Sequence, residues 1–580
     1  MGQVGRLSSA WLRDRRMLGQ VGVAAVPLAA TAVLGWRHRW IADDGLIYFR
    51  VVDNLLRGAG PVFNPGERVE AYTGPAWVAV LTLARWVLPF SLSQIAVYAG
   101  ILFATAGIAL AMVGAARIWR SAGDPGFLVP FGALVLASLL PMWIWMTAGL
   151  ELGLVFLWLG ASCALLGRWT SRTDESMGLV AMCILGLGWV IRPEAIVTSA
   201  IVVATVVACE WRTVSWRRRV GQIGAAVAVP VLYELFRVAY FGMIVSNTAV
   251  AKEGSRASVR AGLNYLHNFV DPYQLWVAGM ILVVLGFVPL LALARRSENN
   301  RTAAVVLASG VAACVGFAIV VVNGGDYLHG RLFLPSVFLL TTPVMLVPIR
   351  RCASGLALML VWGFAAGVYF RPPELEAPVG SHGIQINFQI GATFLSAGEP
   401  WLRVPGPVSV QRTMVGLTPV EAPPPRGLAR PAAAVALLGA YGRFHPDLYV
   451  IDALGLANVA ASHQRLVGRG YPGHEKYFGP PWIAATMAAP GADIDLADYT
   501  VFRPGLGLYQ TVTPNGDHPE AVAVRAARRA LDCGGLADLR AATTGPLSLS
   551  RIIANIGGSI RRTNFRYSSD PVVAERELCR

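Results

Sequence analysis

Charged side chains are scarce in this sequence of 580 residues. Asp, Glu, Lys and Arg make up only 14% of the chain, whereas soluble domains carry about 25%. The mean hydropathy is +0.53, and 55% of the residues are hydrophobic. A chain with so few charges cannot cover its surface with polar groups in water. The composition therefore excludes an ordinary soluble protein and predicts broad contact with membrane lipid.

Acidic residues are fewer than basic ones, 34 against 49, which leaves a net charge of +15. Such an excess can indicate a protein that binds nucleic acid. In this chain the Lys and Arg residues lie in short loops between apolar runs, which is the pattern of cytoplasmic loops in membrane proteins. We therefore expect membrane lipid as a partner and no nucleic acid.

Zinc-type cysteine spacing is absent among the seven cysteines. Basic residues precede the first apolar run, but no cleavage site of small residues leads into a soluble domain, so we expect an uncleaved first helix. Cys533 and Cys579 are the only cysteines of the polar C-terminal part. An oxidising compartment would join them in a disulfide.

Long apolar runs fill the first two thirds of the chain, and about 17 to 25 apolar residues suffice to span a bilayer. Eleven runs are candidate spans: residues 17–35, 94–116, 126–145, 150–167, 177–191, 194–211, 219–241, 274–294, 302–322, 332–348 and 353–370. A further run, 74–90, is interrupted by Arg85 and closed by Pro89. If it lies on the outer membrane interface, every basic short loop faces the cytoplasm, and if it spans, the pattern inverts.

The predicted fold is therefore an α-helical polytopic membrane protein with about eleven transmembrane helices and a cytoplasmic N-terminus. Residues 1–370 form the transmembrane domain, with a first outer loop at 36–93 that contains the interfacial helix 74–90. Residues 371–580 form an extracytoplasmic domain. Strand and helix signals mix there, as in LYVIDALGL, which favours an α/β fold.

Ionisable residues cluster at the outer ends of the predicted spans. They are Asp43, Asp44, Glu151, Arg192, Glu194, Glu234, Arg237, Asp326 and Arg331. Charges in a membrane are costly and usually mark function. A proton-coupled transporter needs them near the midplane, whereas a ring at one face suits the head group of a lipid-linked substrate. A lipid-linked sugar flippase and a carbohydrate-binding anchor protein remain alternatives.

Two adjacent carboxylates, Asp43 and Asp44, follow the first helix. A carboxylate can deprotonate an acceptor hydroxyl or hold a divalent metal that neutralises a phosphate leaving group. The alternative is a helix cap, since Asp favours that position. We expect Asp44 to be the main catalytic group with Asp43 beside it, and Mg²⁺ or Mn²⁺ as a metal held by this pair.

Cations at the same level are candidates for phosphate binding. Arg237, Lys252 and Arg331 could bind the phosphate of the donor. The alternative for each is snorkelling to lipid head groups. Arg192 could also bind phosphate, but pairing with Glu151 or Glu194 is favoured.

Side chains that could contact a sugar or the acceptor include carboxylates, imidazoles and aromatic rings. They are Asp326, His329, Glu151, Arg192, Glu194, Trp40, Tyr72, His474 and Lys476. Indole faces suit sugar stacking but are also typical of an interfacial aromatic belt. A lone His more often makes an ordinary hydrogen bond, and exposed charges such as Lys476 are often only solvated.

The stretch DDGLIYFRVVDNLLRGAGPVFNPGERVEAYTGPAW, residues 43–77, resembles the first outer loop of the GT-C class of glycosyltransferases. Further similar motifs follow in order: TAGLE (147–151), IRPE (191–194), FRVAYFGMIVSNTAVAK (236–252), NGGDYLHGRLFLP (323–335), IDALGLAN (451–458) and GHEK (473–476). Within the class, the chain is most similar to mycobacterial arabinofuranosyltransferases. One departure is Ser246, where many relatives carry Pro, and it puts the local loop conformation in question.

The resemblance implies a membrane glycosyltransferase of cell wall biogenesis in the inner membrane, with its active site on the extracytoplasmic face. The implied donor is decaprenyl-phosphoryl-arabinofuranose, and the acceptors are the arabinan ends of arabinogalactan and lipoarabinomannan. The product would be a terminal β-1,2 linkage formed with net retention, which needs either a covalent intermediate or front-face attack. A GT-C transferase that uses another polyprenyl-phosphate sugar, such as mannose, is the other reading of the same motifs.

Overall fold

The chain folds into two compact units. A computed structural model describes residues 2–124, 126–253, 258–297, 299–326, 328–370, 401, 432–435, 438–444, 446–468, 475–487, 499–503, 508–512 and 519–580. Unit 1 comprises Met1–Trp40, Ser93–Pro230 and Val259–Gln385. Unit 2 comprises Ile41–Leu92, Val231–Ser258 and Ile386–Arg580.

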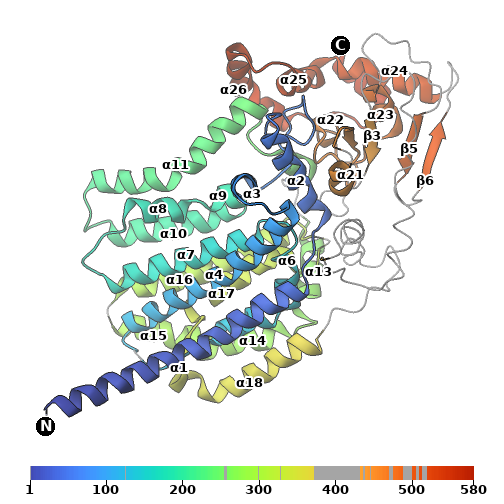
Figure 1. The fold of residues 1–580 in the computed structure, drawn as a ribbon. Helices are drawn as coiled ribbons and strands as arrows, with labels where there is room; N and C mark the ends of the chain where they lie inside the picture. Colours follow the sequence, from blue (N-terminus) through green and yellow to red (C-terminus); the bar gives the residue numbers. More distant parts are fainter. Residues whose placement is uncertain are drawn as a thin grey trace. The chain divides into compact units, whose positions relative to one another are not determined.

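Seven helices of the described residues are long and apolar enough to cross a membrane. They are Leu18–Arg37 of α1 (Gly2–Arg37), α4 (Leu92–Ser121), α7 (Leu152–Ser171), α11 (Trp216–Phe241), the continuous α14, η1 and α15 (Leu275–Arg296), α16 (Asn300–Val322) and α18 (Ile349–Val368). Each coincides with a predicted span. The chain is thus a multi-pass helical membrane protein, and Figure 1 shows the helices of unit 1 running alongside one another.

Four predicted spans are shorter or broken in the structure. They form α5 (Phe131–Ser138) with α6 (Leu140–Trp145), α8 (Leu179–Gly186) with α9 (Gly188–Ile191), α10 (Ala195–Glu210), and α17 (Leu334–Thr341) between the 3-10 turns Arg331–Phe333 and Thr342–Val344. Pro141 lies in the first turn of α6, where its missing N–H is tolerated, whereas it could not continue α5 without losing a backbone hydrogen bond. The total of eleven spans stays a prediction. Two short strands, β1 (Leu128–Val129) and β2 (Val347–Pro348), pair antiparallel in unit 1, and α13 (Val259–Val270) precedes α14.

Glycines hold two of the long helices of unit 1 together. Three on α4 meet three on α7, each seven residues apart: Gly100 with Gly153, Gly107 with Gly160 and Gly114 with Gly167. A Cβ atom on Gly160 would lie 2.0 Å from the backbone oxygen of Gly107. Close backbone approach through small residues is how helices associate in lipid, where the hydrophobic effect no longer drives their contact.

Unit 2 joins the first outer loop to the C-terminal residues. The loop contributes α2 (Asp43–Leu56) and α3 (Pro75–Val87), and α12 (Asn247–Ala251) follows α11. The tail contains α21 (Leu438–Phe444), α22 (Val459–Ser462), α23 (Pro480–Met487), α24 (Pro519–Leu531), α25 (Gly534–Thr543), α26 (Leu549–Asn564) and α27 (Pro571–Leu578). Strands β3 (Ala432–Val435) and β4 (Tyr449–Asp452) pair in parallel, and β5 (Tyr499–Arg503) and β6 (Leu508–Val512) pair antiparallel.

One hydrophobic core runs through unit 2. Val69 of the loop and Met243 pack in the same cluster as Ile451, Trp482 and Tyr567 of the tail. The tail is also closed by a disulfide between Cys533 and Cys579, whose Cα atoms are 5.1 Å apart. At 13 residues, α3 is shorter than the roughly 20 residues that a span needs. Its interfacial position stays a prediction.

Candidate active site

The N-terminus of α2 carries the predicted catalytic pair. Asp43 is its first residue, and Oδ2 of Asp43 accepts a hydrogen bond from the backbone N–H of Gly439 at 3.1 Å. Gly439 lies at the start of α21, where a Cβ atom would come within 1.9 Å of the Asp43 backbone oxygen. Only glycine fits at position 439. Through its hydrogen bond to Gly439, Asp43 connects α2 with α21 in unit 2.

Asp44 is partly exposed one residue further along α2. Residues four apart share a helix face, so Asp44 stands on the same side as Tyr48. The Tyr48 hydroxyl accepts the Gly74 N–H at 3.0 Å and lies 3.2 Å from the Thr73 hydroxyl. The Tyr48 ring is 6.3 Å from the ring of Tyr72. Asp44 thus lies on a face of α2 lined by hydroxyl groups, and its catalytic role stays a prediction.

Arg237 is buried in an ion pair that the sequence did not indicate. Its Nε lies 2.7 Å from Oε2 of Glu70, a fully buried carboxylate, and its Nη1 lies 2.6 Å from Glu234. The Tyr233 hydroxyl donates to Glu70 at 2.6 Å. Burial, with the nearby Glu70, raises the pKa of Tyr72 well above its usual value. The Arg237 guanidinium, which was predicted to bind phosphate, is therefore paired with two carboxylates.

Lys252 differs from Arg237. It caps the C-terminus of α12, is partly exposed, and makes no ion pair with any residue that the structure describes. Helix α12 is held from its other end by Asn247, whose Nδ2 donates to the backbone oxygens of Gly455 and Leu456 at 2.8 and 2.9 Å. Lys252 thus has no carboxylate partner among the described residues, and the helix that carries it is held by hydrogen bonds. Such a cation is suited to bind an anionic ligand.

Ser246 precedes α12 with φ −60° and ψ 150°. These are angles that proline also adopts, because its ring fixes φ near −65°. The substitution of Ser for Pro therefore keeps the loop conformation that the relatives' proline would impose.

Lys476 is a buried cation. Its Nζ lies 2.7 Å from Oε1 of Glu253 and donates to the backbone oxygen of Val250 at 3.1 Å. Arg566 shares the same carboxylate at 2.8 Å. Burial lowers the pKa of Lys476 to about 8, although Glu253 opposes the shift. An acceptor-binding role for Lys476 stays a prediction, and His474 lies outside the described residues.

Asp452 organises the IDALGLAN motif. It is fully buried, with Oδ1 accepting the Leu454 N–H at 2.8 Å and Oδ2 accepting the Ala457 N–H at 2.7 Å. Burial raises the pKa of Asp452 to about 6, although these backbone donors oppose the shift. The motif is thus a tight loop built around a carboxylate.

Unit 1 presents its own ionic groups. Arg192 pairs with Glu151 at 2.6 Å and with Glu194 at 2.8 Å, as the favoured structural reading predicted. Arg331 pairs with Asp326 at 2.7 Å. Together these two arginines and three carboxylates carry a net charge of one negative unit. Their roles toward substrate stay predictions.

His329 and Trp40 are both buried in unit 1. Nδ1 of His329 lies 2.9 Å from Asn268, and Nε2 lies 3.1 Å from the Tyr273 hydroxyl. Burial lowers the pKa of His329 to about 4, so the ring is neutral at pH 7. Trp40 donates from Nε1 to the Ile144 oxygen at 3.0 Å and packs on Trp145. The Trp40 indole has no open face on which a sugar could stack.

Two relatives match most of the chain. A protein of Mycobacterium tuberculosis is 29% identical, and the match covers 94% of this chain and 95% of that protein. A protein of Corynebacterium glutamicum is 30% identical over 79% of this chain and 76% of its own length. Both are named terminal beta-(1->2)-arabinofuranosyltransferase. This chain belongs to that family of arabinofuranosyltransferases. No family model and no solved structure matches it.

A metal site in this arabinofuranosyltransferase rests on Asp43 and Asp44 alone. Among the residues that the structure describes, no group of three or more His, Cys, Asp or Glu side chains is placed to hold a metal ion. Mg²⁺ is often bound by one or two carboxylates together with substrate phosphates and water. The donor set of the pair therefore fits Mg²⁺ or Mn²⁺.

Glu70 and Asn247 are the residues of this arabinofuranosyltransferase that sequence reasoning missed. Glu70 lies in the outer-loop stretch ERVEAYT beside Glu67, and composition alone gave no reason to choose between them. Asn247 stood inside a quoted motif without a role. Its side chain bridges α12 and the 452–458 loop, which only the tertiary structure reveals.

Proposed function

We propose that this chain transfers arabinofuranose from decaprenyl-phosphoryl-arabinofuranose to the arabinan ends of arabinogalactan and lipoarabinomannan, forming terminal β-1,2 linkages. The observation that carries the proposal is the similarity, over 94% of the chain, to a relative named terminal beta-(1->2)-arabinofuranosyltransferase. That match is long enough to include the membrane helices, the first outer loop and most of the tail.

A lipid-linked donor agrees with the architecture. Seven helices in the described part of the chain are suited to crossing a membrane, and a decaprenyl chain would hold the sugar phosphate at the surface of the same bilayer. The active site is placed on the outer side of the membrane, because this orientation leaves the basic short loops in the cytoplasm. Lys252 is the best-placed cation for the donor phosphate, because Arg237 and Arg331 are each already paired with a carboxylate.

The step breaks the bond between C1 of arabinose and the phosphate oxygen and forms a bond between C1 and the acceptor hydroxyl oxygen. Decaprenyl phosphate leaves with the electron pair, and the hydroxyl proton goes to a base. Net retention needs one of two routes. In the first, Asp44 attacks C1 and forms a covalent intermediate, which the acceptor hydroxyl then displaces. In the second, the acceptor oxygen attacks C1 from the side of the leaving phosphate while Asp44 takes the hydroxyl proton. A cation near the phosphate stabilises the negative charge that grows there.

A divalent metal, if bound, would be held by Asp43 and Asp44 and would neutralise phosphate charge. Asp43 has one carboxylate oxygen engaged with Gly439.

The test is a transfer assay with the purified protein in nanodiscs, a short arabinan acceptor, and labelled decaprenyl-phosphoryl arabinose or polyprenyl-phosphoryl mannose. We expect transfer from the arabinose donor, and a product whose new linkage is β-1,2 by NMR. Transfer from mannose instead would replace the proposed donor. Movement of the labelled lipid across sealed vesicles without transfer would favour a flippase and contradict the proposal.

A further inference from the structure

Helix α26 of the tail carries an apolar stripe that no part of the described protein covers. Its largest aliphatic side chains are exposed: Leu549 by 74%, Ile553 by 63%, Ile556 by 51% and Ile560 by 64%. Their spacing of four, three and four residues places them on one side of the helix. Four exposed aliphatic residues on one side of a helix are unusual on a protein surface that faces water.

The protein-facing side of the same helix is polar. Asn555, Ser559, Arg562 and Thr563 are its buried residues. At about 100° per residue, this buried side is centred roughly 110° from the aliphatic stripe. The third side, with Arg551, Ala554 and Arg561, is left for water or charged groups. A helix that packs on its own protein through polar groups and presents an aliphatic stripe to the outside has the pattern of a helix lying in a membrane interface.

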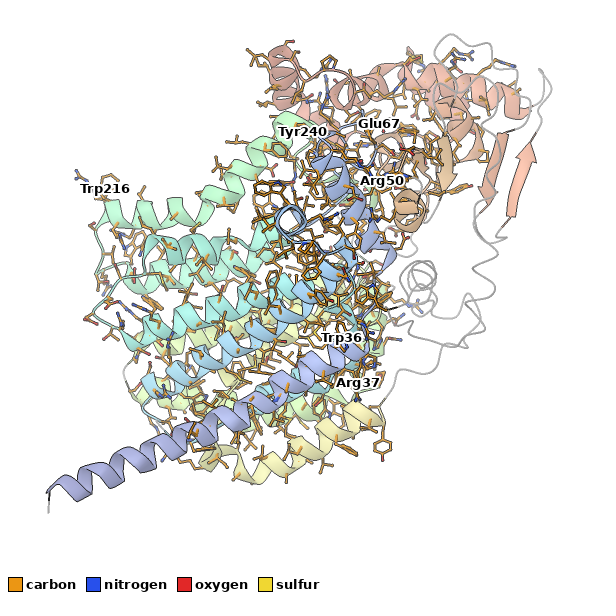
Figure 2. All side chains as sticks on the ribbon, viewed as in Figure 1. Trp36, Arg37, Arg50, Glu67, Trp216 and Tyr240 are labelled. Carbon is orange, nitrogen blue, oxygen red and sulfur yellow. A yellow bond between two sulfur atoms is a disulfide. The ribbon has the colours of Figure 1, made fainter. Side chains whose placement is uncertain are left out.

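The hydrogen bonds of α26 show that it lies at the C-terminal end of α11. Asn555 donates to the backbone oxygen of Ala239 at 3.0 Å, and Arg562 donates to that of Gly242 at 2.9 Å. The Ile244 N–H donates to the Thr563 hydroxyl at 3.1 Å. Ala239 belongs to the last turn of α11, and Gly242 and Ile244 directly follow that helix. Figure 1 shows α26 beside this end of α11, and Figure 2 labels Tyr240 there and Trp216 at the opposite end.

Exposed apolar side chains of α11 extend nearly to the same point. Leu232, Leu235 and Phe236 are exposed aliphatic and aromatic side chains on its last three turns. Because α11 is a candidate span ending at Phe241, the bilayer surface must lie close to Ala239 and Gly242. A helix hydrogen-bonded to those residues therefore meets the head-group region.

We propose that α26 is an in-plane membrane anchor, with Leu549, Ile553, Ile556 and Ile560 inserted among the lipid acyl chains at the surface where α11 emerges. Exposed Arg561 lies beside the stripe and would meet lipid phosphates. The partner is thus a phospholipid surface. The inference depends on α11 crossing the membrane, and neither on which side is cytoplasmic nor on the sugar that the enzyme transfers.

The experiment places a fluorophore on the stripe and on the water-facing side of the same helix. The free cysteines Cys163, Cys183, Cys209, Cys314 and Cys352 are replaced by Ala in the full chain, and the Cys533–Cys579 disulfide is kept. Ile556→Cys carries the probe NBD, and Ala554→Cys, two residues away and exposed, is the matched control. Both proteins are placed in phosphatidylglycerol-containing nanodiscs, with and without lipids that carry a nitroxide on the upper acyl chain.

We expect NBD at position 556 to show blue-shifted emission and loss of intensity with the nitroxide lipid, and NBD at 554 to show neither. If the Ile556 variant does not fold, Ile560→Cys samples the same stripe. Water-like emission at both stripe positions would overturn the proposal. A blue shift without nitroxide quenching would also overturn it and point to a second copy of the chain or another protein segment. Equal quenching at 554 and 556 would overturn the in-plane orientation.

Discussion

The two units of this arabinofuranosyltransferase use charge in different ways. In unit 1 the ionic groups gather at helix ends, while the helix interfaces are close-packed through glycine pairs such as Gly107 with Gly160. In unit 2 charged side chains penetrate the core: Arg50, Glu70, Arg237 and Lys476 are all buried. The contrast follows from the secondary structure that each unit must support.

Long helices satisfy their own backbone, but the loops of unit 2 do not. Arg50 donates to the backbone oxygens of Phe63 at 2.7 Å and of Leu448 at 2.7 Å. Arg68 donates to the backbone oxygens of Tyr240 at 3.2 Å and of Ala542 at 3.0 Å. Buried carbonyl groups must find donors, and a guanidinium provides five. In unit 2, a buried charge by itself therefore does not indicate catalysis.

The largest effect on the transfer rate is expected for a substitution of Asp44, and it tests whether a charge of unit 2 takes part in catalysis. Asp44→Asn should lower the transfer rate by about 10² to 10⁴-fold, because the base or nucleophile is lost. The melting temperature should stay the same, since Asn is as good a residue as Asp at a helix N-terminus. The rate is measured by labelled-sugar transfer, and folding by thermal unfolding in detergent.

Asp43→Asn is the matched control, because an amide oxygen can still accept the Gly439 N–H. It should lose less activity than Asp44→Asn. If Asp44→Asn keeps most of its turnover, Asp44 is structural, as the buried charges of the unit are, and Asp43 or Asp326 becomes the candidate.

Lys476 tests the structural side of the comparison. Lys476→Met leaves Glu253 buried without the Lys476 ammonium, and breaking a buried pair costs about 3 to 5 kcal/mol. Thermal unfolding should show the loss. The control is Arg529→Met, which removes an exposed pair with Glu575 and should cost about 0 to 1 kcal/mol. Unchanged stability with lost transfer in Lys476→Met would instead support direct acceptor binding.

Sequence alone predicted the membrane character of the chain and the positions of the seven long helices, because apolar length is a local property. It did not predict that the spans at 126–145 and 332–348 would be broken into short helices. Pro141, Pro335 and Pro343 begin new helical turns there, yet prolines are tolerated in many membrane helices, so their effect depends on neighbouring packing.

The site was predicted unevenly for a similar reason. The pairing of Arg192 with Glu151 and Glu194 was the favoured reading, since the short outer loops bring these residues to one membrane face. The Glu70–Arg237 pair joins residues 167 positions apart, and nothing local identifies such a pair. The resemblance to known enzymes named the right family, whereas the role of each charge depends on contacts that no motif encodes.

Lys252 sharpens the comparison, because it is the predicted phosphate-binding cation that has no ion pair within the described chain. Lys252→Ala should lower kcat/KM for the lipid donor by about 10- to 100-fold, the value of one hydrogen bond to a charged group. Stability should be unaffected, and Lys252→Arg should restore much of the activity. Full donor use by the Ala variant would assign the phosphate to another cation.

The smallest effect concerns the pH dependence of stability and two separate buried residues, His463 and Asp452. Burial, together with the nearby Arg566 and Lys476, lowers the pKa of His463 to about 3, although backbone hydrogen bonds oppose the shift. Between pH 6.5 and 3 the unfolded chain therefore binds a proton that the folded chain does not, so this group favours unfolding as the pH falls. Asp452 acts in the opposite sense, since its pKa is raised to about 6 and the folded chain binds the extra proton between pH 6 and 3.8.

The two groups should nearly cancel in the wild type between pH 6 and 4, and single substitutions should separate them. Relative to wild type, His463→Gln should gain stability as the pH falls through this range, and Asp452→Asn should lose it, each by at most about 1.4 kcal/mol per pH unit. Melting temperatures of the three proteins in detergent at pH 7, 6, 5 and 4 measure the difference. Opposite slopes would confirm that burial is the largest cause of both pKa shifts. Parallel slopes in the two variants would mean that at least one of these side chains is not buried in the folded protein as the structure places it.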